Sequence, residues 1–184
     1  MTPTVRRTQE SLAEAAEPQS SSLSVLVANQ TDGPCDAGRI EAAVRAALAD
    51  SPYTQGTISV AMVDNAAIHG LNRQFLEHDW PTDVLTFPLA DDPPSLEAEI
   101  VVSRETAQEL AAEAGWPTDD ELILYVVHGA LHLAGYDDHE ADDLAAMWTR
   151  EAAVLDGLGI RRSPADARWE GISGARCAQE KDAP

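Results

Sequence analysis

Apolar and polar residues along the chain follow two different periods, which predicts strands interleaved with helices. Short apolar runs rich in β-favouring residues predict buried strands at residues 23–28, 57–63, 84–89 and 97–102. Other segments carry apolar residues every three or four positions, as at Ile40, Val44 and Leu48, which is the period of an amphipathic helix. The pattern predicts one α/β (α+β) domain, in which a mixed sheet of about four strands packs with about five helices.

Residues at the segment ends indicate where the predicted helices begin and stop. Asp36 and Ser103 each precede a helical segment and can accept hydrogen bonds from its first turn, so both are predicted N-caps. Pro81 is predicted to end the helix that contains Ile68, because proline cannot continue a helix.

The most apolar segment, residues 119–134, is predicted to form a buried helix. Thr118 and Glu121 have the spacing of a capping box at its start, and Gly135 can end it. The run is shorter than the roughly 20 residues that a bilayer-spanning helix needs, so no membrane span is predicted.

The two ends of the chain differ from its middle in composition. Residues 1–22 and 161–184 are polar and lack a sustained apolar period, so we predict flexible tails around a domain at 23–160. The N-terminal residues show no signal-peptide pattern, and a cytoplasmic location is expected. Cys35 and Cys177 lack the spacing of a disulfide framework or of a cysteine zinc site.

Charge limits the partners that the surface can attract. Asp and Glu together number 32, against 12 for Lys and Arg, in 184 residues. Such a surface repels phosphate backbones on average. If RNA is the substrate, local arginines, a metal ion or another protein must offset this repulsion.

Two histidines four positions apart in the predicted buried helix indicate a metal site. His128 and His132 would lie on one helical face, one turn apart. A catalytic zinc site needs a third protein ligand and keeps one position for water. Asp138 and His139, just beyond Gly135, can each supply that ligand. The pattern predicts one Zn²⁺ ion and leaves both residues open as its third ligand.

The residue after the first histidine argues against a peptidase. In zincins, a glutamate at this position acts as the general base. Here the position is Gly129, so a zinc hydrolase acting on peptides is the weaker hypothesis.

The same segment resembles the signature of a known family. His128-Gly-Ala-Leu-His-Leu-Ala-Gly-Tyr-Asp137 is similar to the signature of the YbeY family, and Asp79-Trp-Pro-Thr-Asp-Val-Leu-Thr-Phe-Pro88 is similar to its second recurrent block. The similarity covers about residues 57–159. It implies a metal-dependent, single-strand-specific endoribonuclease that acts in 3′-end maturation of small-subunit (16S) rRNA and in ribosome quality control. The implied partners are the rRNA precursor, the small ribosomal subunit, and ribosomal or assembly proteins.

Two positions depart from the family pattern. The family's third ligand is a histidine six positions after the second, and here Asp138 occupies that position while His139 follows it. The family arginine that is linked to RNA cleavage is replaced by Leu76. Arg73, one helical turn earlier, is the predicted substitute unless it is only a solvated surface arginine, and Arg104 is a second, weaker candidate.

The general base remains open among three carboxylates near the histidines. The candidates are Asp137, Glu140 and Glu121, and Asp137 is also expected to cap the last helix with Glu140 as its partner. Thr82 and Asp83 are expected either to line the cleft or to cap the chain after the preceding proline. A metal-stabilised module that binds the ribosome or a protein without catalysis is the remaining alternative, which the acidic charge favours.

Overall fold

The structure is a computed structural model that describes residues 22–161. Within this range four strands form one mixed sheet in the order β1-β2-β4-β3. The strands are β1 (Leu23–Asn29), β2 (Gln55–Val63), β3 (Val84–Asp92) and β4 (Ser95–Ser103). β1, β2 and β4 run parallel to one another, and β3 pairs antiparallel with β4. The predicted four-stranded mixed sheet is confirmed.

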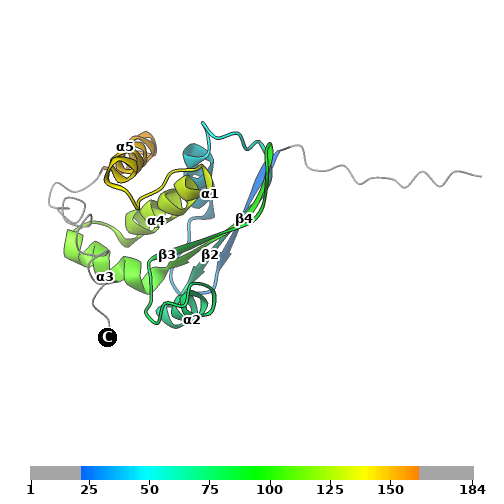
Figure 1. Cartoon of the computed structure of the whole chain (residues 1–184). Helices are drawn as coiled ribbons and strands as arrows, with labels where there is room; N and C mark the ends of the chain where they lie inside the picture. Colours follow the sequence, from blue (N-terminus) through cyan, green and yellow to red (C-terminus); the bar gives the residue numbers. More distant parts are fainter. Residues whose placement is uncertain (1–21, 162–184) are drawn as a thin grey trace, which may run out of the picture.

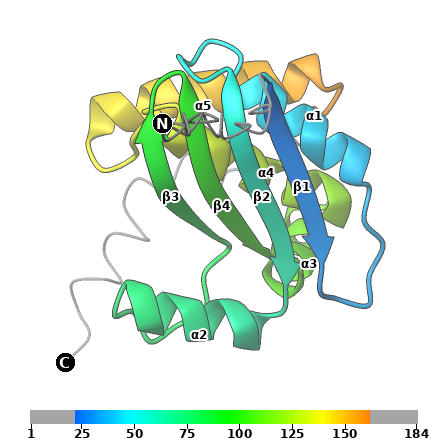
Figure 2. The ribbon, with the colours of Figure 1, turned by 90° about the vertical axis from the view of Figure 1, so that its right-hand side faces the viewer.

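Five helices pack with this sheet, as predicted, among the residues that the structure describes. They are α1 (Ala37–Ala47), α2 (Asn65–Phe75), α3 (Arg104–Ala114), α4 (Thr118–Leu133) and α5 (Ala141–Gly157). α1, α4 and α5 lie on one side of the sheet, and α2 crosses one end of it (Figures 1 and 2). In this range no helix combines the length and apolar character needed to cross a membrane. The tails predicted at 1–22 and 161–184 lie outside the described residues, except for Ser22 and Arg161.

Alternating side chains of the central strands build a core on each face of the sheet. Ile58 and Met62 of β2 belong to the large cluster that includes most of α4, whereas Ala61 and Val63 belong to a small cluster with Ile68 of α2. This alternation follows from the period of two along a strand. The large cluster fixes α4 against the sheet, and α4 carries both predicted zinc histidines.

The predicted helix caps are partly confirmed. Asp36 accepts a hydrogen bond from the backbone N–H of Arg39 at 3.1 Å, and Ser103 accepts one from Thr106 at 3.1 Å. The prediction that Pro81 ends α2 is wrong, because α2 already ends at Phe75.

The predicted capping box of α4 is wrong for a different reason. Pro117 is the N-cap and makes no side-chain cap hydrogen bond, so Thr118 is the first helical residue. Glu121 instead accepts a hydrogen bond from the indole N–H of Trp116 at 2.6 Å. A half-buried tryptophan therefore binds the carboxylate that the local cap would have used.

Gly129 lets α4 approach the sheet closely. A Cβ atom at this position would lie 2.7 Å from Oγ1 of Thr86 and 3.0 Å from Cγ2 of Ile100. The first contact is shorter than real Cβ contacts and the second is tight, so a side chain here would push the helix or the strands apart. The close approach also explains why the position cannot carry the glutamate of a zincin.

Gly129→Ala should therefore lower the free energy of unfolding by about 1–2 kcal/mol, although alanine favours helices over glycine. Gly70→Ala in α2 is the matched control, because a Cβ there meets nothing within 4 Å. The control should raise stability by about 1 kcal/mol. Urea denaturation followed by circular dichroism measures both, and equal effects would refute the packing argument.

Candidate metal centre and cleft

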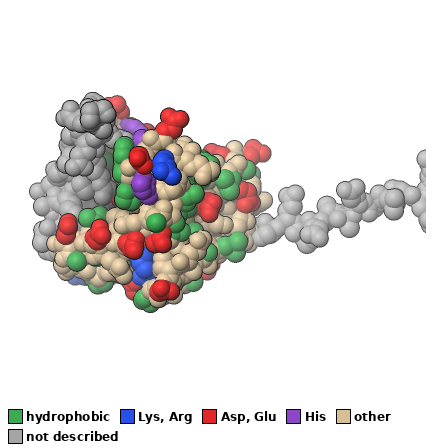
Figure 3. Space-filling model, turned by 90° about the horizontal axis from the view of Figure 1, so that it is seen from below, with side chains coloured by type: hydrophobic (Ala, Val, Ile, Leu, Met, Phe, Trp, Pro, Cys, Tyr) green, Lys and Arg blue, Asp and Glu red, His purple; other side chains and the backbone are tan. Residues whose placement is uncertain are grey.

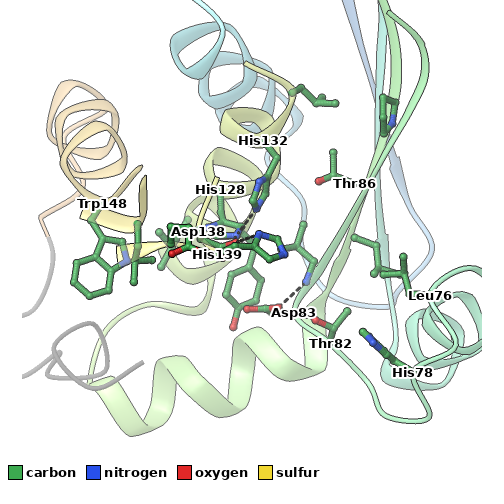
Figure 4. Close-up of a pocket in the computed structure, with 18 of the residues that line it drawn as sticks. Leu76, His78, Thr82, Asp83, Thr86, His128, His132, Asp138, His139 and Trp148 are labelled. Carbon is green, nitrogen blue, oxygen red and sulfur yellow. Dashed lines mark hydrogen bonds and ion pairs between the residues drawn. The ribbon is translucent and has the colours of Figure 1, made fainter. Parts of the chain in front are cut away.

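α4 places the two histidine rings side by side near its C-terminal end. The ring centroids of His128 and His132 are 4.7 Å apart, and the two Nε2 atoms are 3.1 Å apart. This follows from their spacing of four residues, which stacks side chains on one helical face. Figure 4 shows both rings pointing into a cleft between α4 and β3.

A left-handed glycine ends α4 and returns the chain toward these rings. Gly135 has φ 93°, its N–H donates to the carbonyl of His132, and the N–H of Tyr136 donates to that of Leu131. This pair of bonds is a Schellman motif, so the predicted termination at Gly135 is confirmed. The same turn brings the Tyr136 carbonyl to 3.1 Å from Nδ1 of His132, and a carbonyl can only accept.

α5 supplies the partner of the other ring. Oε1 of Glu151 lies 2.8 Å from Nδ1 of His128, and the Glu151 side chain has no exposed surface. A carboxylate behind a histidine fixes the ring orientation and the tautomer, as is usual behind metal-binding histidines.

These two bonds determine which atoms face the cleft. Because both Nδ1–H groups donate to oxygen, the Nε2 atoms of His128 and His132 meet through their lone pairs at 3.1 Å. Two facing lone pairs repel each other unless a cation, either a proton or a metal ion, lies between them. The geometry therefore selects a positively charged species.

The electrostatics of the two rings agree with this arrangement. Burial lowers the pKa of His128, but the hydrogen bond and charge of Glu151, with Asp83 and Asp138, outweigh it and raise the pKa above its usual value. Burial and the neighbouring His128 lower the pKa of His132. One positive charge is thus favoured on the pair, and two are not.

Asp138 and His139 take different positions beyond the turn. Oδ2 of Asp138 is 3.7 Å from Nε2 of His128, and one ligand atom from each of His128, His132 and Asp138 lies within 4.8 Å of the others. Ligands around a tetrahedral zinc ion are about 3.3 Å apart. The His139 side chain is 81% exposed and contacts Asp137. His128, His132 and Asp138 could therefore hold a metal ion. His139 belongs instead to an outer group with Asp137 and Asp138.

Asp137 organises the loop and does not cap α5 as predicted. Its Oδ1 accepts hydrogen bonds from the backbone N–H groups of Asp138 at 2.7 Å and His139 at 3.3 Å. The hydrogen bond from the His139 ring lowers the pKa of the Asp137 carboxyl most, and the hydrogen bond from the Asp138 backbone lowers it further. Glu140 is the N-cap of α5 and makes no side-chain cap bond.

The histidines lie in an open cleft with a volume of about 960 Å³. Thr82 and Asp83 line it, as one of the two sequence hypotheses expected, together with Leu76 and His78 on the side of β3. Asp83 accepts the backbone N–H of Val84 at 3.0 Å, which fixes its carboxylate at the start of β3.

The cleft receives some of the predicted catalytic residues and not others. Glu121 and Glu140 line it, but Glu121 is buried and bonded to Trp116. Arg73 is exposed, 3.9 Å from Asp79, and is not a lining residue. Arg104 is buried at the start of α3 and bonds the carbonyl of Pro34.

The sequence reasoning missed the role of Glu151. The signal was present, because Glu151 lies on the same apolar stripe of α5 as Met147, four residues before it, and Val154, three residues after it. A carboxylate on a buried stripe requires a polar partner. Here that partner is the His128 ring.

Two imidazoles and a carboxylate in an open cleft are the donor set of metal-dependent hydrolases. The sequence comparisons narrow this class. The family model described as "Endoribonuclease YbeY" matches residues 26–159. The chain belongs to this family of endoribonucleases, as its resemblance implied.

Individual relatives agree with this assignment. An Endoribonuclease YbeY of Rhodopirellula baltica is 45% identical over 122 residues, which span 65% of this chain and 62% of the relative. One from Rhodospirillum rubrum is 36% identical over 165 residues, 78% of this chain and 82% of the relative. The solution structure of TM1509 from Thermotoga maritima is similar with a TM-score of 0.52 and 27% identity, covering 77% of this chain and 95% of that one.

The third ligand can be tested by two neighbouring substitutions. Asp138→Ala should reduce zinc content from one ion per chain to a small fraction of that, because it removes the carboxylate closest to the rings. His139→Ala should retain one ion. Metal analysis after gel filtration measures both, and loss of zinc in the His139 variant alone would assign the ligand to His139.

Glu151→Gln tests the carboxylate behind His128. The variant keeps the shape of the side chain but loses its charge, so zinc affinity should fall about 10- to 100-fold. Competition with a chromophoric chelator measures the affinity. An unchanged affinity, in a variant with unchanged circular dichroism, would show that Glu151 only fills space.

Proposed function

We propose that this chain is a zinc-dependent endoribonuclease specific for single-stranded RNA. We further propose that it acts in the cytoplasm, in 3′-end maturation of small-subunit rRNA and in ribosome quality control. Its partners would be the rRNA precursor, the small ribosomal subunit, and ribosomal or assembly proteins. Membership of the YbeY family supports the RNA substrate.

One observation carries the metal assignment. The Nε2 lone pairs of His128 and His132 face each other at 3.1 Å, and the carboxylate of Asp138 lies beside them. Imidazole nitrogen and carboxylate oxygen are ordinary zinc ligands. The donors thus fit a zinc ion with three protein ligands and an open position.

When bound, zinc would polarise a phosphoryl oxygen or lower the pKa of a water molecule toward neutrality. The protein residues contribute orientation and proton transfer. Glu151 and the Tyr136 carbonyl hold the two rings in the tautomer that presents Nε2 to the cleft. Asp83 and Glu140, which line the cleft, can take a proton during hydrolysis.

A peptidase is disfavoured by packing. The helix position that carries the general base in zincins is Gly129, where a side chain would overlap Thr86 of β3.

Cleavage of a labelled single-stranded RNA should stop when zinc is removed with a chelator and return when zinc is restored. His128→Ala should lower the rate by at least about 100-fold, because a metal ligand is lost. His69→Ala is the matched control, since His69 bonds Asp79 and is not a lining residue of the cleft. Gel electrophoresis of the products measures the rates.

RNA binding without cleavage in the zinc-loaded protein would favour the non-catalytic binding module. Equal activity of the metal-free and zinc-loaded protein would contradict a metal-dependent nuclease.

A further inference from the structure

The cleft offers neither lysine nor arginine side chains to an RNA backbone, among the residues that the structure describes. The acidic residues that line it are Asp83, Asp91, Glu121, Asp138 and Glu140. Acidic side chains also predominate over basic ones on the face of the molecule seen in Figure 3. Unless a bound metal ion intervenes, phosphates are repelled here, so a substrate needs another source of binding energy.

Aromatic and apolar side chains are exposed at the end of α2 and in the segment that follows it, a rim from which Leu76 and His78 line the cleft. Phe75 is 57% exposed, Leu76 49% and Trp80 43%. The rings of His78 and Trp80 are stacked, with centroids 4.7 Å apart and planes inclined by 12°. Exposed aromatic rings on a folded surface commonly mark a binding site.

The segment that carries this stack is held in place by the protein. Asn72 is only 2% exposed, and its Nδ2 donates to the carbonyl of Trp80 at 2.8 Å. The backbone carbonyl of Asn72 accepts hydrogen bonds from the backbone N–H groups of Leu76 and His78. Between them, Glu77 has φ 62°, which reverses the chain after α2. The stack is therefore built in before any ligand arrives.

One ring of this stack reaches the cleft of the candidate metal centre, because His78 lines that cleft and Trp80 packs against His78. Leu76 and His78 line the same cleft as His128, His132 and Asp138. Figure 4 shows Leu76 and His78 on one side and the histidine cluster on the other. A nucleotide whose phosphate lies at the metal centre could thus extend its base, or that of a neighbour, toward the rim.

We propose that the His78–Trp80 stack is a platform on which an unpaired base of the RNA substrate stacks, and that it replaces phosphate binding by arginine in this chain. This inference rests on the proposed nuclease function. Base stacking on aromatic rings needs no positive charge and tolerates every base. Paired bases cannot reach such a platform, so the stack selects single-stranded RNA.

The test compares two unlabelled competitors during cleavage of a labelled single-stranded RNA by the zinc-loaded protein. One competitor is an RNA, and the other is an abasic RNA of the same length and backbone charge. The abasic competitor should inhibit the wild-type protein about tenfold more weakly. Trp80→Ala should raise KM for the labelled RNA about tenfold and remove most of the difference between competitors, whereas kcat and zinc content stay nearly unchanged.

Two further variants control for loss of structure and of apolar surface. Trp80→Phe keeps an aromatic face and should restore most of the affinity. Leu26→Ala removes an exposed apolar side chain from β1, at the opposite edge of the sheet, and should change nothing.

The possible failures are distinct. A wild-type protein that cleaves RNA but is inhibited equally by both competitors would overturn the platform and leave the nuclease standing. An unchanged KM in Trp80→Ala would do the same. A wild-type protein that neither binds nor cleaves RNA would overturn both proposals.

Discussion

The site depends on two hydrogen bonds, which the Nδ1–H groups of His128 and His132 donate to oxygen atoms. Once the Tyr136 carbonyl and the Glu151 carboxylate have accepted these hydrogen bonds, both imidazoles must present Nε2 to the cleft, at 3.1 Å from each other. Burial and helix packing thereby hold the two rings in an arrangement that is unfavourable without a cation. Preorganised metal sites use the same kind of arrangement, in which hydrogen-bond partners of the ligands set the ligand geometry.

Close packing between α4 and the sheet keeps the two histidines near β3. Gly129 lies one residue beyond His128 and lets the helix backbone approach β3 and β4. The ring of His128 thus stays close to the strand that carries Thr86, and the cleft runs along β3. Gly129 therefore sets the distance between α4 and the sheet directly beside His128.

Much of the fold could be predicted because its signals are local. Strand and helix periods gave all four strands and five helices of the described region, and Gly135 ended α4 through a conformation that glycine adopts easily. The failures came from non-local partners. Glu121 does not cap α4 because it accepts a hydrogen bond from the half-buried indole of Trp116, and the role of Glu151 depends on a ring of another helix. Spacing along the chain placed the two histidines on one face, but only the fold places Asp138, and not His139, beside them.

The burial of Glu151 has a consequence for the last helix. Glu151 has no exposed surface and reaches His128 from α5, so an ion bound at the histidines would connect α5 to α4 through this carboxylate. Loss of the ion would weaken that connection but leave the apolar contacts of Met147 and Val154 in place. A bound metal ion would then increase the protection of α5 amides against hydrogen exchange. Local opening of this helix and release of the ion are thermodynamically linked.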